Sequence, residues 1–167
     1  MAAEGDLTGR FMLDSVDGRR ITDEAFRGKV RVVTFGYTFC PDICPTTLST
    51  LSVVIDRLGA DMGKVAMLFI SIDPERDTPS HLKDYLSAFP GITGLTGSPE
   101  MVAGAARNFR ARYERQPAPD GDPKAYAVDH SAGIYIMGRD GRFAAKLGHM
   151  ATPDEVTARI RSVLDPR

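Results

Sequence analysis

A chain of 167 residues is long enough to bury a full hydrophobic core and short enough to form a single domain. With 43% hydrophobic and 26% charged residues, its composition is that of a water-soluble globular protein. The net charge is −1 without a basic block, which argues against a nucleic-acid partner, and the longest aliphatic or aromatic run, VAMLFI at 65–70, is far too short to span a bilayer.

Hydrophobic periodicity predicts the helices and strands. In chain order we expect a hairpin over 11–22, a buried strand over 30–37, a helix from Pro45 to just before Gly59, a buried strand over 65–72, helices over 79–89 and 99–109, two segments at 111–116 and 124–129 that pair across a Pro/Gly loop, a hairpin of strands over 131–137 and 142–148, and a helix over 152–164. The last helix begins with a capping box, in which Thr152 is the N-cap and Glu155 its partner.

This order of elements predicts an α/β fold. Helices that connect the early strands require those strands to be parallel, whereas a short turn makes the last two strands antiparallel. A mixed central sheet flanked by helices in this order is the thioredoxin-like arrangement, here with an N-terminal hairpin and an insertion around 111–129. We expect residues 1–10 to form an N-terminal tail and residues 11–167 to form one domain.

The two cysteines of the chain, Cys40 and Cys44, are separated by three residues, and a proline follows each of them. They lie between the first long strand and the first helix, at the edge of the sheet where α/β proteins place their sites. Because proline disfavours helix at the residue before it, Pro45 predicts that Cys44 is the helix N-cap. Thiols at a helix start form thiolate more readily, and a thiolate serves in disulfide exchange or as a metal ligand. The plainer alternative is two buried small residues or an incidental disulfide.

The spacing and the number of thiols help to choose among metals. A structural zinc site needs four Cys or His ligands, and the chain has only two thiols. Cu(I), a soft ion of low coordination number, is satisfied by two thiolates and one further ligand.

A third ligand is sought among three histidines. His81 is predicted to be an exposed surface residue, and His149 a capping or loop residue. His130 directly precedes a strongly predicted strand, in a loop that lies beside the active-site helix in thioredoxin-like folds, and Asp129 is its neighbour. The seven methionines are scattered along the chain, which favours core packing or loop positions over a ligand set.

Several long blocks resemble the Sco family, also called SenC/PrrC, in the same order: FGYTFCPDICPTTL, FISIDPERDTPSHLKDYLSAF, ITGLTGSPE and VDHSAGIYIMGRDGRF. These are membrane-tethered copper proteins needed for the assembly of cytochrome c oxidase. The resemblance implies a thioredoxin-like fold and one copper ion, as Cu(I) and also Cu(II), held by Cys40, Cys44 and His130. It also implies outer-shell roles for Asp129 and Asp73, the latter structural or outer-shell only.

The resemblance further implies a copper metallochaperone that delivers copper to the binuclear copper site of cytochrome c oxidase. Its expected partners are the oxidase subunit with that site and a copper-donor chaperone, with no nucleic acid, and the chain is expected to be monomeric. Family members usually carry an N-terminal membrane helix, which this sequence lacks. We therefore expect the soluble domain of an anchored protein on the periplasmic side of a bacterial membrane, or alternatively in the mitochondrial intermembrane space.

Two other functions remain open. A thiol-disulfide reductase would use Cys40 and Cys44 as its catalytic pair to keep the cysteines of the oxidase subunit reduced, and it would not need His130. A copper or redox sensor would use the same residues. A peroxiredoxin-like peroxidase expects Ser or Thr three residues before its reactive cysteine, where this chain has Tyr37 and Pro41.

Overall fold

The computed structural model describes residues 7–39, 43–122, 126–130 and 133–165. The strands are β1 (Met12–Ser15), β2 (Arg20–Thr22), β3 (Val30–Gly36), β4 (Val65–Ser71), β5 (Ile92–Thr96), β6 (Tyr113–Gln116), β7 (Ala127–His130), β8 (Ile134–Met137) and β9 (Phe143–Leu147). The helices are α1 (Ile43–Leu58), α2 (Pro79–Leu86), α3 (Pro99–Asn108) and α4 (Pro153–Leu164), with short 3-10 segments η2 (Asp23–Phe26) and η3 (Gly59–Lys64). None of the helices in these ranges is long and apolar enough to cross a membrane.

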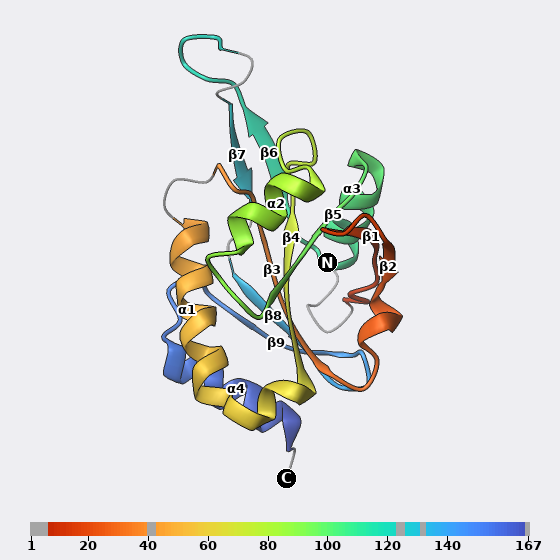
Figure 1. Ribbon diagram of the computed structural model, residues 1–167, viewed down its shortest axis with the longest axis vertical. Helices are drawn as coiled ribbons and strands as arrows, with labels where there is room; N and C mark the ends of the chain where they lie inside the picture. Colours follow the sequence, from red (N-terminus) through yellow and green to blue (C-terminus); the bar gives the residue numbers. More distant parts are fainter. Residues whose placement is uncertain (1–6, 40–42, 123–125, 131–132, 166–167) are drawn as a thin grey trace.

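One mixed sheet organises the chain, in the strand order β2-β1-β5-β4-β3-β8-β9 (Figure 1). Strands β3 and β4 run parallel and β8 and β9 are antiparallel, as predicted. Strand β5 runs parallel to β4, and β8 runs antiparallel to β3. Every residue of β3 and β4 is buried, which explains why both read as continuous apolar runs. Their in-register pairing ends with Gly36 opposite Ser71, so the two segments that follow these strands start side by side.

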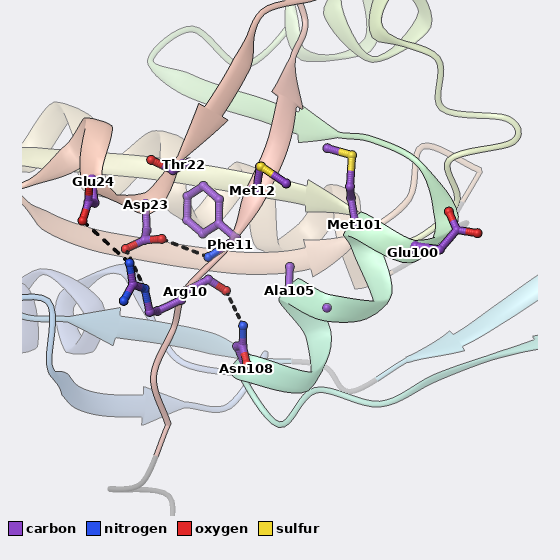
Figure 2. Close-up of a pocket in the computed structure, with 11 residues that line it drawn as sticks. Arg10, Phe11, Met12, Thr22, Asp23, Glu24, Glu100, Met101, Ala105 and Asn108 are labelled. Atoms are coloured by element: carbon purple, nitrogen blue, oxygen red, sulfur yellow. Dashed lines mark hydrogen bonds and ion pairs between the residues drawn. The ribbon is translucent and has the colours of Figure 1, made fainter.

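The N-terminal segment packs between η2 and α3. The backbone carbonyl of Arg10 accepts a hydrogen bond from Asn108 Nδ2 at 2.9 Å, and the Phe11 amide donates to Asp23 Oδ1 at 3.1 Å (Figure 2). A groove of about 470 Å³ remains beside Met12 and Met101, and its described lining includes none of the predicted site residues. The division between an N-terminal tail and a domain at residue 11 stays a prediction.

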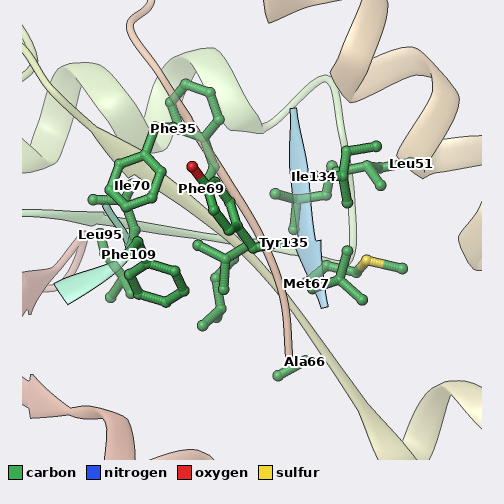
Figure 3. Packing of buried hydrophobic residues seen from close by; sticks show 14 of the residues in the cluster. Phe35, Leu51, Ala66, Met67, Phe69, Ile70, Leu95, Phe109, Ile134 and Tyr135 are labelled. Carbon is green, nitrogen blue, oxygen red and sulfur yellow. The ribbon is translucent and has the colours of Figure 1, made fainter. Parts of the chain in front are cut away.

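Buried hydrophobic side chains pack on both faces of the sheet. Phe35, Phe109 and Tyr135 meet edge to face, with ring centroids 5.4 to 5.9 Å apart. Neighbouring strand residues point to opposite faces, so Ile134 faces away from this cluster, toward Leu51 of α1 (Figure 3). Of the methionines, Met67 and Met137 belong to the core, as predicted, whereas Met12 is 49% exposed and Met150 81% exposed.

Strand β5, between α2 and α3, was not among the predicted strands. It is short and has Gly94 at its centre. A Cβ atom at Gly94 would lie 2.6 Å from Leu86 Cδ1 and 3.0 Å from Leu82 Cδ2, so the missing side chain lets α2 lie directly on the strand. The glycine that weakens the strand pattern in the sequence is required by helix packing.

Two boundaries near the candidate site also differ from prediction. Helix α1 begins at Ile43, so Cys44 is a first-turn residue and not the N-cap. Pro45 is tolerated because a first-turn amide has no acceptor within the helix, and this outweighs the steric preference against helix before proline. The strand predicted from residue 131 begins at Ile134, and His130 is the last residue of the preceding strand β7.

The predicted insertion forms its own two-stranded antiparallel sheet, which extends beyond the main sheet in Figure 1. Its register places Tyr113 opposite His130 and Glu114 opposite Asp129. The predicted pairing of 111–116 with 124–129 is thus confirmed for the strands β6 and β7. The capping box of α4 is also present, with Thr152 and Glu155 bonded as predicted.

We predict that Gly94→Ala lowers the free energy of unfolding by about 1–3 kcal/mol, because the new methyl group overpacks the α2–β5 contact. Urea denaturation measures the change. Gly104→Ala is the matched control: the nearest atom to a Cβ at Gly104 is the Arg107 guanidinium at 3.8 Å, and Ala is favoured over Gly in a helix by roughly 1 kcal/mol. Equal stability of Gly94→Ala and wild type would contradict the close packing.

Candidate metal centre

The predicted cysteines follow β3 in the sequence, and the predicted histidine ends β7. Cys40 lies outside the described residues. Cys44 belongs to the first turn of α1, and Asp129 and His130 are the last two residues of β7, but the side chains of these three residues lie outside the described part of the structure. Among the side chains that are described, no group of three or more His, Cys, Asp or Glu residues is arranged to hold a metal ion. The ligand set therefore stays a prediction. The described residues around it show whether the two ligand-bearing segments lie close together.

A hydrogen bond joins the two segments that carry the predicted ligands. The backbone amide of Val128, two residues before His130, donates to the Tyr37 hydroxyl at 3.1 Å. Tyr37 is itself buried at the end of the β3 segment, three residues before Cys40. The segment that leads into Cys40 and the strand that ends at His130 therefore lie against each other, although Tyr37 and Val128 are 91 residues apart in the sequence.

Asp73 follows β4 and is 2% exposed. Its Oδ2 receives the Arg76 Nε at 2.5 Å, and its Oδ1 accepts a hydrogen bond from the Tyr126 hydroxyl at 2.6 Å. Both carboxylate oxygens are thus engaged by side chains from two segments. This arrangement suits the structural or outer-shell role predicted for Asp73, because Tyr126 lies directly before the strand that carries His130.

Asp77 contacts the segment that leads into Cys40, and the sequence did not indicate this role. It is fully buried, and its carboxylate accepts three hydrogen bonds: from the Thr38 amide at 3.0 Å, from the Thr38 hydroxyl at 2.6 Å and from the Ser71 hydroxyl at 2.6 Å. These bonds fix the backbone two residues before Cys40. The signal in the sequence was a second aspartate four residues after Asp73 in SIDPERDTP, but the sequence does not show which donors it meets.

His81 is exposed, as predicted, but it is not an isolated surface residue. Its ring stacks on Phe39 with centroids 5.3 Å apart and 15° between the planes, and its Nε2 lies 2.8 Å from the Thr38 hydroxyl oxygen. Phe39 directly precedes Cys40 and is 50% exposed. His81 therefore contacts the segment that leads into the cysteine loop, which its polar sequence neighbourhood did not indicate.

Comparison with known proteins assigns the family. The family model described as SCO1/SenC matches residues 1–165. The chain belongs to the SCO1/SenC family. Its structure resembles that of Bradyrhizobium japonicum ScoI with copper bound, with a TM-score of 0.85 and 42% identity over 94% of this chain and 99% of that one. It also resembles yeast Sco1 with copper bound, with a TM-score of 0.87 and 34% identity over 97% of this chain and 90% of that one.

The sequence relatives are longer than this chain. The Arabidopsis thaliana mitochondrial SCO1 homolog 1 is 39% identical over 93% of this chain, which corresponds to 46% of the relative. The chain spans about half the length of the curated relatives it matches. The comparisons confirm the Sco family and its thioredoxin-like fold, and homologous structures hold copper.

In this Sco-family chain Tyr126 has an unusual environment. Burial and the hydrogen bond to the Asp73 carboxylate favour the neutral phenol and raise the pKa of Tyr126 to about 12. The folded-state pKa lies above the ordinary value of 10.0, so the stabilising contribution of Tyr126 is complete below about pH 10 and is lost as the pH rises toward 12.

We predict that Tyr126→Phe removes the phenolate absorbance step near pH 12. Difference titration of wild type against the variant by ultraviolet absorbance measures the step. In guanidinium chloride the same difference should move to about pH 10, the value of an unperturbed tyrosine. A difference that titrates near pH 10 in the folded protein would show that the Asp73–Tyr126 hydrogen bond does not raise the pKa of the Tyr126 phenol.

Proposed function

We propose that this chain binds one copper ion through Cys40, Cys44 and His130 and delivers it to the binuclear copper site of cytochrome c oxidase. The observation that carries the proposal is the contact between the two ligand-bearing segments, made by the Tyr37 hydroxyl and the Val128 amide. Two thiolates and one imidazole form a donor set suited to Cu(I). Copper in the related ScoI and Sco1 structures supports the same metal here.

The described carboxylates support a ligand set of thiolates and imidazole. Asp73 and Asp77 are the buried acids beside these segments, and side-chain or backbone donors engage both oxygens of each. These carboxylates hold neighbouring segments in place through their hydrogen bonds and ion pair. Softer donors from the cysteine loop and the end of β7 are left to meet the ion, which matches the preference of Cu(I) for sulfur and nitrogen.

The partners and the location are part of the proposal. One related protein, BsSco, with 24% identity and a TM-score of 0.73, shares the fold and is described as a member of the Sco family of cytochrome c oxidase assembly proteins. We infer that the acceptor is the oxidase subunit with the binuclear copper site and that a separate copper chaperone is the donor. The inferred location is the periplasmic side of a bacterial membrane, reached with a membrane anchor, with the mitochondrial intermembrane space as the alternative.

We predict that the reduced chain binds one Cu(I) and that either Cys40→Ala or Cys44→Ala abolishes tight binding. His130→Ala should weaken binding by about tenfold or more, which corresponds to roughly 1.4 kcal/mol or more, because one of three ligands is lost. Competition with a chromophoric Cu(I) chelator measures both effects. His149→Ala, in the turn before α4, is the control and should bind as wild type does. Tight binding that survives Cys44→Ala would remove the basis of the assignment.

A thiol-disulfide reductase is the second candidate. The position of Cys44 in the first turn of α1 favours it, because the positive end of a helix dipole stabilises a thiolate. Disulfide exchange needs an accessible thiolate and a second cysteine that resolves the mixed disulfide. The chain has two cysteines, Cys40 and Cys44, four residues apart in the sequence. Such an activity would not require His130.

The effect of His130→Ala on oxidase assembly in cells distinguishes the two functions. If copper transfer is the role, His130→Ala should lower oxidase activity nearly as far as Cys40→Ala does. The measurement is oxidase activity in a deletion strain that expresses each variant fused to a membrane anchor, with protein levels matched. A His130→Ala variant that binds no copper and still restores the oxidase would favour the reductase.

A further inference from the structure

We propose that Arg76 is the positioning residue that holds the His130 segment at the cysteine loop. The inference rests on the proposed copper site and adds a residue outside its ligand set. Arg76 lies in the turn between β4 and α2, and its side chain is 13% exposed. Its guanidinium contacts aromatic rings from both of the segments that carry the proposed ligands.

The distances show this double contact. The guanidinium carbon of Arg76 lies 3.6 Å from the centre of the Tyr126 ring and 4.6 Å from the centre of the Phe39 ring. The Tyr37 ring centre is 5.7 Å away. Phe39 is the residue before Cys40, and Tyr126 lies four residues before His130. One side chain therefore spans the gap between the two segments.

The guanidinium is held in this place by charge. Its Nε lies 2.5 Å from Oδ2 of Asp73, a residue that is 2% exposed. The other carboxylate oxygen of Asp73 accepts a hydrogen bond from the Tyr126 hydroxyl at 2.6 Å. A buried ion pair adds little net stability, because desolvation offsets the attraction, but it can specify one arrangement. Asp73, Arg76 and Tyr126 thus form a closed set of contacts: an ion pair, a hydrogen bond and a cation–π contact.

The site has a physical need for such a residue. Cys40 and Cys44 are four residues apart in the sequence, so their separation is limited by the chain itself, whereas His130 comes from a separate two-stranded sheet. The third ligand binds well only if its segment is already in place, because ordering it on binding costs affinity. Arg76 supplies this order, and as a cation it is not itself a metal ligand.

The planar guanidinium is specific to this task. Arginine stacks on aromatic faces and keeps its hydrogen-bonding direction, while lysine is a compact, mobile point charge. Arg76→Lys therefore keeps the charge opposite Asp73 and loses the stacking on Tyr126 and Phe39. Removal of groups that orient a metal ligand typically costs about 10–100-fold in metal affinity.

The test is a double-mutant cycle for Cu(I) affinity, measured by chelator competition on wild type, Arg76→Lys, His130→Ala and the double variant. We expect Arg76→Lys to weaken binding by about tenfold in the wild-type background. In the His130→Ala background the same change should alter affinity by less than about twofold, because no third ligand remains to be positioned. Thermal unfolding of each metal-free protein is measured alongside.

Three further variants make the result specific. Arg31→Lys changes another buried arginine, in β3, and should leave Cu(I) affinity unchanged. Tyr126→Leu removes the ring on which Arg76 stacks and should reproduce the affinity loss of Arg76→Lys, so the inference stays testable if Arg76→Lys fails to fold. Tyr126→Phe keeps the ring and should lose less.

Several results would overturn the inference. An unchanged affinity in Arg76→Lys would do so, and so would an equal loss in both backgrounds, which would place the effect on the cysteines or on general stability. If His130→Ala itself leaves Cu(I) affinity unchanged, the proposed ligand set fails, and the inference about Arg76 fails with it. If His130→Ala weakens binding and the two substitutions act additively, only the role of Arg76 is refuted.

Discussion

Two carboxylates are buried in the turn that follows β4, and the guanidinium between them in sequence is largely buried as well. A charged group inside a protein is costly unless it is paired and hydrogen-bonded. Asp77 meets this requirement with donors from Thr38 and Ser71, and Asp73 meets it with Arg76 and Tyr126. Each carboxylate is satisfied only when segments distant in sequence converge, so the need to neutralise these charges defines the surroundings of the candidate centre.

The sheet and the charged turn have different tasks. The parallel pairing of β3 and β4 ends with Gly36 opposite Ser71 and brings the two following segments to one edge. The apolar core sets this edge but does not specify the loops that leave it, because dispersion and burial have little directionality. The hydrogen bonds of Asp77 and the stacking of Arg76 supply the direction. A rigid scaffold with precisely held loops is the usual arrangement at binding sites.

The parts of the fold that follow from local pattern could be predicted from the sequence. Strands β3 and β4 are continuous apolar runs, and α4 has a complete capping box. Strand β5 could not be found, because Gly94 serves the packing of α2 and not the strand pattern.

The candidate site divides in the same way. Cys40, Cys44 and His130 are predicted as ligands from ligand chemistry and from family resemblance, both of which depend on single residues and short motifs. Asp77 and Arg76 were missed because their roles depend on partners far away in the chain: Thr38 is 39 residues from Asp77, and Tyr126 is 50 residues from Arg76. Their motif, SIDPERDTP, shows the charges but not what they contact.

The N-terminal hairpin has a consequence for behaviour in solution. Strand β1 pairs with β5 through Asp14–Thr96 and Ser15–Leu95, and β2, only three residues long, becomes the outer strand. An exposed edge strand offers unpaired amides and carbonyls to other chains, and short edge strands limit this hazard. Loss of the first strands to proteolysis would uncover β5, a mostly buried strand, and turn a closed edge into a template for intermolecular β-pairing. By pairing with β5, the hairpin limits aggregation at the edge of the sheet most distant from β9.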